Sequence, residues 1–316
     1  MCTRNRAEHL GPALESVAAI DVPSDLSAEL LVVDNGSTDD TKRIVEQCAP
    51  GSMPVRYIWE PRGGKSCAYN AALSQARGAV LLCTDDDVRV PEEWVRSMCA
   101  PILRGEADAV AGPVHLAPGL HREWMTALHR ACLACTEGST DGPRIDLVGA
   151  NMAIGRHVLG RVPAFDEALG PGVVGGGEDT LFGRQVREAG YTVVRCTAPP
   201  VVHYLDPVRL CRAAWRRMAQ DRGAVLAYLR HHWEHAVVEH AVRRLVRALR
   251  DLAVLRIRRS RQWHWDEGMP AWEIEQITRV EYYRAHLHAR RERHRYAKHG
   301  LVRLHGATTR CPWRRS

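Results

Sequence analysis

Strand-like and helix-like segments alternate through the first part of the chain, and this alternation restricts the fold more than any other feature. The apolar runs "AELLVVD" and "AVLLCTDDD" are each followed by a segment with helical spacing, "TKRIVEQCA" and "PEEWVRSMCAPILRG". "VRYIWE" and "ADAVAGPV" have the pattern of further strands, and "GGKSCAYNAALSQARG" that of a turn and a helix. Repeated units of this kind predict an α/β fold with a doubly wound, mostly parallel sheet.

Acidic residues gather where two of the predicted strands end. Asp34 follows "LLVV", and Asp85, Asp86 and Asp87 follow "LLCT". One aspartate would be enough to cap the helix that begins after Pro91, so capping explains a single acid and not three. Unpaired buried charges cost several kcal/mol each, so we expect cations to meet these carboxylates. Ligands of doubly wound sheets bind at the carboxyl ends of strands, and the two clusters therefore favour a ligand site.

A glycine-rich loop precedes a later helix. "VGANMAI" has a strand pattern, and "GPGVVGGGEDTLFGRQVREAG" leads through three consecutive glycines into a helix that begins near Glu178 and Asp179. Acids in a first turn complement the helix dipole, but the glycines indicate a loop that moves or approaches another group closely. "YTVVRCTAPPVVHY" is predicted to be a strand, and its His203 is either structural or a ligand.

The composition excludes other classes of protein. The 316 residues are 45% hydrophobic with no low-complexity tract, enough for a large domain and an appendage. The ten cysteines lack the spacing of a disulfide framework, and we expect Cys132 and Cys135 to be core residues of a helix. No run reaches the roughly 20 apolar residues that span a bilayer. These features predict a protein of a reducing cytosol, either soluble or peripheral to a membrane.

Eight motifs, in order, resemble those of the family 2 glycosyltransferases, which have the GT-A fold. They are "CTRNRAEHLGPALESV", "LLVVDNGSTDDT", "GGKSCAYNAAL", "LLCTDDDVRVPEEW", "GANMAI", "FDEALGPG", "GGGEDTLFGRQVREAGY" and "VVHY". The resemblance implies a Rossmann-like GT-A domain over residues 1–205 and a C-terminal α-helical extension. It also implies an inverting enzyme that moves a hexose-like sugar from a nucleotide-diphosphate sugar to a nucleophile on a glycan, lipid, natural product or protein.

The resemblance assigns the aspartates and His203 to a divalent cation that neutralises the leaving diphosphate. Asp86 is most similar to the family's metal-binding acid, and Asp87 and His203 complete the implied metal site. Asp85 matches a position that contacts the ribose, the sugar or the metal. Manganese and magnesium suit such sites, so Mn²⁺ or Mg²⁺ is the implied cofactor.

Five matching positions are implied to bind the nucleotide of the donor. Thr3 and Arg4 lie in the first turn, and Lys65 lies in the "GGK" turn, where its charge suits a phosphate. Asp34 matches the acid that accepts a hydrogen bond from the base, and Asn35 lies beside it. These positions would surround the donor on one side of the site.

Three further positions are implied to face the sugar and the acceptor. Asn151 of "GAN" falls near the sugar and acceptor pocket, and Asp179 matches the family's general base. Glu178 precedes this base and is expected to contact the acceptor or begin the helix. An inverting enzyme needs one such base and no covalent intermediate.

The N-terminus departs from the family pattern. Relatives carry a short apolar strand before "CTRNR", whereas here Met1 occupies its last position. A parallel sheet that is buried on both faces does not tolerate such a loss easily. We therefore expect a truncated first strand and a coding start upstream of Met1.

The C-terminal third is basic and is divided by composition into a helical extension over residues 206–262 and an Arg/His/Trp-rich segment over residues 263–316. An apolar stripe with arginines opposite it predicts an amphipathic helix; the stripe is Val238, Val242, Leu245, Leu249 and Leu252, and the arginines are Arg243, Arg247 and Arg250. Such a helix packs on the catalytic domain or a second subunit, or it binds a membrane surface; nucleic acid is the least favoured partner. "ARRERHRYAKHG" is expected to be a solvated helix or a tail.

Three functions therefore compete. The leading one is a nucleotide-sugar glycosyltransferase that works in the cytoplasm or at the inner face of the cell membrane. The second is a non-catalytic protein that binds nucleic acid or a membrane surface through the basic C-terminal region. The third is another α/β metal enzyme such as a phosphatase, but no phosphate-accepting nucleophile stands out at a strand end. The ordered acids at Asp34, Asp85 to Asp87 and Asp179 favour the first.

Overall fold

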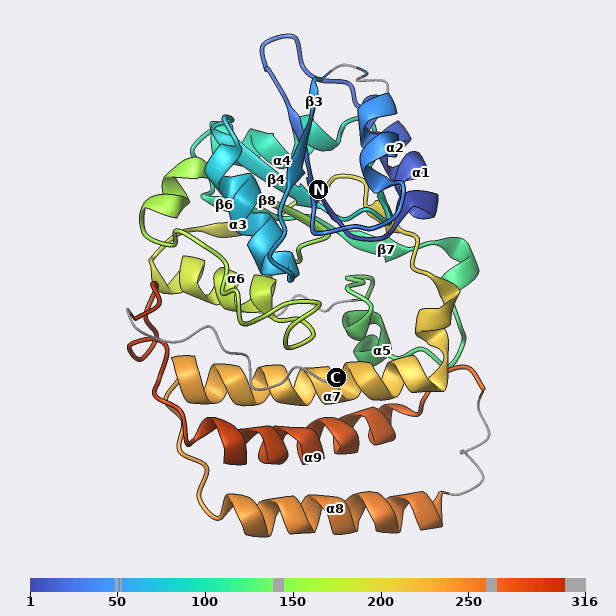
Figure 1. The fold of residues 1–316 in the computed structure, drawn as a ribbon, viewed down its shortest axis with the longest axis vertical. Coiled ribbons are helices and arrows are strands. Elements are labelled where there is room, and N and C mark those ends of the chain that lie inside the picture. Colours follow the sequence, from blue (N-terminus) through green and yellow to red (C-terminus); the bar gives the residue numbers. More distant parts are fainter. Residues whose placement is uncertain (49–50, 52, 139–144, 260–265, 305–316) are drawn as a thin grey trace.

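Two layered regions make up the molecule, a sheet flanked by helices and a stack of three long helices (Figure 1). The structure is a computed structural model that describes residues 1–48, 51, 53–138, 145–259 and 266–304. None of the described helices is long and apolar enough to cross a bilayer.

The central sheet consists of a parallel group and a mixed group. The parallel group runs in the order β1 (Cys2–Thr3), β2 (Leu30–Asp34) and β3 (Val55–Trp59). The mixed group runs in the order β4 (Val80–Thr84), β8 (Asn151–Gly155), β6 (Ala109–Ala111) and β9 (Val193–Arg195). A single parallel bridge between Cys2 and Asp85 joins the two groups. The predicted α/β fold is thus confirmed, with β8 antiparallel to both its neighbours.

A small third sheet brings His203 to the aspartates. It runs in the order β5 (Val88–Arg89), β10 (Val201–His203) and β7 (Val114–Leu116). His203 pairs with Val88, directly after the aspartate triplet. The segment predicted as one strand, "YTVVRCTAPPVVHY", forms two strands in different sheets, because its two prolines provide no backbone N–H for a continuous ladder.

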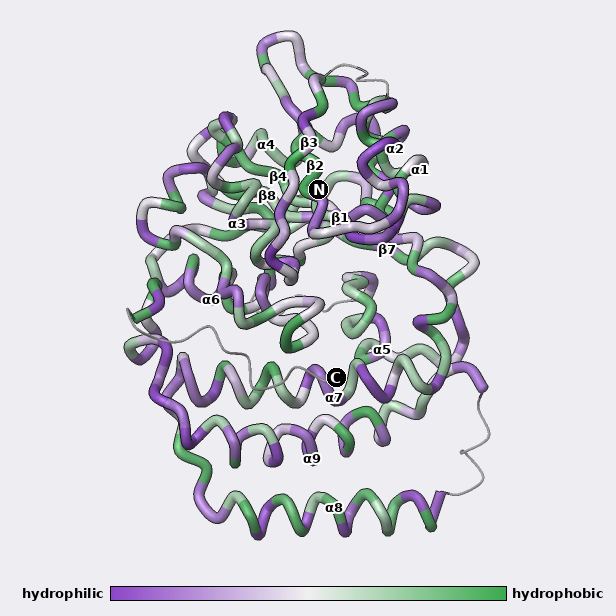
Figure 2. The backbone as a smooth tube through the Cα atoms, in the orientation of Figure 1, coloured by the Kyte–Doolittle hydropathy of each residue, from purple (hydrophilic) through white to green (hydrophobic). Residues whose placement is uncertain are grey.

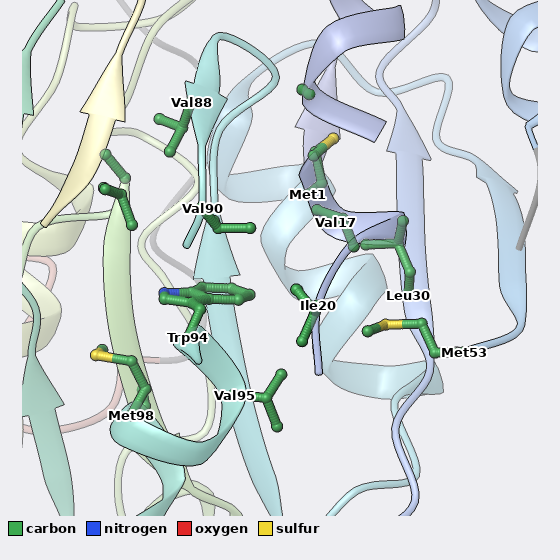
Figure 3. Close-up of a cluster of buried hydrophobic side chains, with 14 of the residues drawn as sticks. Met1, Val17, Ile20, Leu30, Met53, Val88, Val90, Trp94, Val95 and Met98 are labelled. Atoms are coloured by element: carbon green, nitrogen blue, oxygen red, sulfur yellow. The ribbon is translucent and has the colours of Figure 1, made fainter. Parts of the chain in front are cut away.

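The helices of the sheet region are α1 (Ala7–Ala18), α2 (Thr41–Gln47), α3 (Lys65–Gln75), α4 (Trp94–Leu103), α5 (Ala127–Cys132) and α6 (Glu178–Glu188). The segments predicted to be helical correspond to α2, α3, α4 and α6. Of the two cysteines expected in one helix, Cys132 ends α5, and Cys135 is buried but lies beyond it. Figure 3 shows how side chains of α1, β2 and α4, among them Val17, Leu30 and Trp94, share one apolar layer. Figure 2 shows the same pattern as hydrophobic strands in the interior of the sheet region. This core fixes the strand ends that carry the acids.

The first strand is short but paired. The backbone N–H of Val33 donates to the carbonyl of Met1 over 2.9 Å, and the amino group of Met1 donates to the carbonyl of Leu31, also over 2.9 Å. Met1 is buried and belongs to the core cluster of Figure 3. This pairing places Thr3 beside Asp34.

Three long helices form the C-terminal stack. α7 (Arg212–Tyr228) continues into a π-helical turn over Leu229–Trp233, and α8 (Ala241–Arg258) and α9 (Ala271–Ala289) follow. In space α9 lies between α7 and α8 (Figure 1). The helical extension expected up to residue 262 and the Arg/His/Trp-rich segment expected after it therefore contribute helices, α8 and α9, to the same stack. The predicted amphipathic helix corresponds to α8, and one face of it packs on α9.

The segment after α9 returns to the sheet region. Arg295 and Tyr296 are buried, and Tyr296 joins an apolar cluster with Leu169 and Tyr228. Arg303 lies 3.4 Å from Asp166. The expectation of a solvated helix or tail for "ARRERHRYAKHG" is wrong here, because its partners are distant in sequence and a charge run does not show them.

Candidate functional site

The strand ends open into a cleft of about 1230 Å³. Its walls come from the end of β1, the turn after β4, the start of α6 and one face of α7. This volume exceeds that of ordinary ligand pockets, which hold one drug-sized molecule. The cleft therefore has room for two substrates side by side.

Two cationic side chains lie beside the aspartate triplet. Lys65 Nζ lies 2.6 Å from Asp85 Oδ1, and the guanidinium of Arg6 lies 2.7 Å from Asp87 and 3.7 Å from Asp86. The cations expected from the sequence are thus present, and Arg6 was not among the predicted site residues.

The pKa values of two of these acids move in opposite directions. Burial, together with the negative charge of Asp87, raises the pKa of Asp86 to about 6. Burial also opposes ionisation of Asp87, but a hydrogen bond with His203 and the charge of Arg6 hold the pKa of Asp87 well below its usual range. Of these two acids, Asp87 is therefore the more firmly ionised.

A group suited to a metal ion lies beside Arg6. Among the described residues, Asp85, Asp87 and His203 form the group of three in which the possible ligand atoms all lie within 4.8 Å of one another. His203 Nε2 is 3.0 Å from Asp87 Oδ1, while its buried Nδ1 has no hydrogen-bond partner among those residues. Carboxylate oxygens and an imidazole fit a divalent ion such as Mn²⁺. Asp86 lines the same cleft but lies outside this group.

The acids at the start of α6 face the cleft from the opposite side. Asp179 accepts hydrogen bonds from the backbone N–H groups of Gly149, over 3.0 Å, and Thr180, over 2.6 Å. Burial raises the pKa of Asp179, and burial with the charge of Asp179 raises the pKa of Glu178 to about 7. A carboxylate that is held in place and has a raised pKa can accept a proton near neutral pH.

Most of the predicted nucleotide-binding residues line the cleft. Thr3, Arg4, Asn35 and Lys65 do so. Asn35 fixes the "GGK" turn, because its side chain accepts from Gly64 N over 2.8 Å and donates to the carbonyl of Arg62 over 2.7 Å.

Two predicted residues lie away from the cleft lining. The carboxylate of Asp34 is buried and accepts from the Tyr57 hydroxyl over 2.9 Å and from Ser37 N over 2.8 Å. Asn151 donates to the carbonyl of Pro113 over 2.9 Å and accepts from Trp94 Nε1, also over 2.9 Å. Both side chains support neighbouring segments of the site.

Sequence reasoning missed the wall that α7 provides. Arg222, Val225 and Leu226 of α7 line the cleft, followed by Leu229 of the π-helical turn. They lie far along the chain from the aspartates and carry no motif. Arg6 in "CTRNR" was also missed, although the need for cations near three acids was a signal for a residue of its kind.

The fold and the cleft together define a class of protein, the GT-A glycosyltransferases, in which acids at strand ends face a cleft for a nucleotide sugar. Comparison with known proteins agrees. The profile of Glycosyl transferase family 2 matches residues 1–168. The chain is 30% identical over 244 residues to the succinoglycan biosynthesis protein ExoM of Rhizobium meliloti (strain 1021), covering 73% of this chain and 75% of that protein.

The chain therefore belongs to glycosyl transferase family 2, and it is an enzyme that uses a nucleotide sugar. This excludes a phosphatase and a non-catalytic protein. The chain is also 25% identical over 236 residues to the succinoglycan biosynthesis protein ExoA of the same strain, covering 72% of this chain and 68% of that protein.

Solved structures show the same fold. The mannosyltransferase PcManGT from Pyrobaculum calidifontis, in complex with GDP-Man and Mn²⁺, superposes with a TM-score of 0.52 at 20% identity, over 92% of this chain and 71% of that one. Residues 1–349 of S. aureus TarS, in complex with UDP, give 0.51 at 18% identity, over 92% and 90%. At these identities the likeness concerns the fold alone.

Proposed function

We propose that the enzyme transfers a sugar from a nucleotide-diphosphate donor to an acceptor hydroxyl or amine, with inversion and with a divalent metal bound at Asp85, Asp87 and His203. The observation that carries the metal assignment is the spacing of these three side chains, whose ligand atoms lie within 4.8 Å of one another. When bound, Mn²⁺ or Mg²⁺ neutralises charge on the departing diphosphate. In this assignment Asp86 lines the cleft beside the metal site, whereas the sequence-based expectation made it the metal-binding acid.

The donor lies on the side of β1 and the "GGK" turn. Thr3, Arg4 and Lys65 face this part of the cleft, and Lys65 supplies a fixed positive charge next to Asp85. Asn35 and Asp34 hold the surrounding turns, so they orient the nucleotide pocket. A cation that is already paired with a carboxylate can shift to a phosphate at little cost, because both partners are anions.

The acceptor lies on the side of α6 and α7. Asp179 removes the proton from the acceptor nucleophile as this nucleophile attacks the anomeric carbon, and Glu178 beside it contacts the acceptor. A single displacement with one base inverts the configuration. Val225 and Leu226 of α7 form an apolar wall and Arg222 a polar contact for the acceptor.

The biological setting follows from the relatives. ExoM and ExoA are named for succinoglycan biosynthesis, so we place this enzyme in the assembly of a polysaccharide, with a carbohydrate acceptor. Nine cysteines in the described part of the chain are free, which suits a reducing cytoplasm where nucleotide sugars are made.

The proposal is tested by titration calorimetry of UDP and GDP with Mn²⁺, with and without chelator. Asp87→Asn should lower nucleotide affinity by more than the roughly 10- to 100-fold typical of a residue that only supports a metal ligand. Asp86→Asn should keep the dependence on metal, and the exposed Asp40→Asn is the matched control. Nucleotide binding that is unchanged by chelator would remove the metal from the mechanism. Release of nucleotide diphosphate from a panel of sugar donors then identifies the donor.

A further inference from the structure

The outermost helix of the molecule, α8, uses only part of its apolar surface in packing. Ala241 and Ala248 are buried against the stack, and Leu245 and Leu252 are half-buried beside them. These positions repeat every three or four residues and therefore define one face of the helix. Figure 1 shows α8 at the edge of the stack, with α9 on one side.

A second apolar row on α8 is exposed. The α8 apolar row consists of Val242, Val246, Leu249 and Ile257, whose residues are 55%, 62%, 48% and 75% exposed. At 100° per residue, this row lies directly beside the packed face. The apolar sector of α8 is thus about twice as wide as its contact with α9. The predicted stripe is split between the two sectors, with Leu245 toward α9 and Leu249 toward solvent.

Arginines follow the α8 apolar row on its other side. Arg243, Arg247 and Arg250 are exposed and continue the helix surface beyond the row. The one acid within α8 is Asp251, and it already contacts Arg250 and Arg279, each at 3.4 Å or less. Figure 2 shows the resulting alternation of hydrophobic and hydrophilic residues along α8.

We propose that the α8 apolar row and its flanking arginines bind the surface of a membrane that contains anionic phospholipids. The helix lies parallel to the membrane, the row enters the boundary between headgroups and acyl chains, and the arginines contact phosphates. This arrangement is typical of basic amphipathic helices at interfaces. The inference goes beyond the proposed function and does not depend on it.

The charges favour lipid over the other occupants. Pairing of α8 with a second copy about a two-fold axis would bring two rows of arginines together, and Asp251 is already neutralised within each copy. Nucleic acid would satisfy the arginines but would leave the apolar row in water. An anionic membrane matches both features at once.

The catalytic cleft stays accessible in this arrangement. No residue of α8 lines the cleft, and α7, which does, is separated from α8 by α9. Membrane contact through α8 therefore leaves the cleft free to receive a donor from solution.

The test is co-sedimentation of the full chain with phosphatidylcholine vesicles, prepared with and without phosphatidylglycerol. The parent should sediment with the anionic vesicles. Leu249→Asp should reduce binding at least about tenfold, because it places a charge in the row that enters the membrane. The control Leu103→Asp alters a leucine of nearly equal exposure, 51% against 48%, at the end of α4, and should bind as the parent does.

A second pair of variants tests the arginines. Arg243→Gln, Arg247→Gln and Arg250→Gln combined should lower vesicle binding roughly 100-fold, since each arginine near an anionic surface contributes a factor of about five. Arg43→Gln, Arg96→Gln and Arg104→Gln combined remove the same charge from exposed positions of the sheet region and should have little effect. Melting temperatures near the parent value confirm that the variants fold.

Three outcomes would overturn the proposal. The first is equal vesicle binding by the α8 variants and their controls. The second is self-association of the parent that Leu249→Asp abolishes, without vesicle binding. The third is binding of duplex DNA that depends on the arginines but not on Leu249.

Discussion

Three adjacent carboxylates, Asp85, Asp86 and Asp87, meet different surroundings although they follow one another in the chain. Asp85 pairs with Lys65, and Asp87 pairs with Arg6 and His203. Asp86 has the 3.7 Å contact with Arg6, and burial together with the charge of Asp87 raises the pKa of its carboxylate. Three residues of the same type therefore differ in their surroundings. Asp85 and Asp87, together with His203, are the ones whose ligand atoms lie close enough to hold one metal ion.

Asp179→Asn should retain donor binding and reduce transfer. The amide can still accept from one backbone N–H, but it cannot take the acceptor's proton, and a positioned base contributes roughly 10²- to 10⁴-fold in rate. Glu178→Gln should reduce transfer less, because Glu178 only contacts the acceptor in this assignment. The measurements are transfer rate and donor affinity for both variants and product stereochemistry for the parent. Equal rates for parent and Asp179→Asn, or retained anomeric configuration, would refute the assignment.

At the scale of elements, the contact of α7 with α9 depends on a glycine. A Cβ at Gly223 of α7 would lie 2.5 Å from the carbonyl oxygen of Thr278 and 2.9 Å from the backbone nitrogen of Tyr282, both in α9. Backbone atoms of a helix cannot move aside singly. The close approach is therefore possible only without a side chain at this position.

Gly223→Ala should destabilise the protein by about 1–3 kcal/mol, the usual cost of overpacking a core. The matched control is Gly11→Ala within α1, where nothing lies within 4 Å of the new Cβ. This control should leave stability unchanged or raise it by up to about 1 kcal/mol through helix propensity. Chemical denaturation of both variants provides the comparison. A Gly223→Ala protein as stable as Gly11→Ala would show that the two helices are not held this closely.

One buried carboxylate connects all three helices of the stack. Glu273 of α9 hydrogen-bonds to Arg212 of α7 and, over 2.7 Å, to Arg256 of α8. Glu273 is 1% exposed, whereas both arginines reach solvent in part.

Glu273→Gln should lower the free energy of unfolding by about 3 kcal/mol, the lower end for breaking a buried ion pair, since the arginines left behind can rehydrate. The control Glu106→Gln removes the surface pair with Arg104 and should cost much less, because exposed ion pairs contribute little to stability. Denaturation midpoints with equal slopes would measure the difference. Equal losses in the two variants would contradict the role of Glu273 as a link.

At the scale of the whole molecule, the features that the sequence predicted depend on residues close together in the chain, and the features that it missed depend on contacts between distant segments. The ends of β2 and β4 carry their acids within one apolar run, so Asp34 and the triplet could be placed from periodicity and turn signals alone. Arg222 lines the same cleft, but it lies on a helix with no motif. Its position depends on how α7 packs against the rest of the molecule. Docking is a sum of many contacts between distant segments, which no local pattern encodes.

A cluster of histidines joins the end of α7 to the returning C-terminal segment. Burial, with the nearby charge of Arg295, lowers the pKa of His232 from 6.5 to about 2. The titratable and charged groups around it are Tyr228, His231, Glu292, His294, Arg295 and Arg303. The carboxylate of Glu292 lies 3.6 Å from His232 but also pairs with Arg295, and most of the other neighbours are basic, so a proton on His232 stays unfavourable.

Acidification should therefore destabilise the whole fold. The folded state binds this proton only near pH 2, whereas the unfolded chain binds it below about 6.5, so stability falls as the pH drops below 6.5, by up to about 1.4 kcal/mol per pH unit for this group. Melting temperatures between about pH 7.5 and about pH 5.5 measure the slope. His232→Gln should flatten it, whereas His9→Gln on the exposed side of α1 should not. A His232→Gln slope equal to that of the parent would show that the junction tolerates the charge.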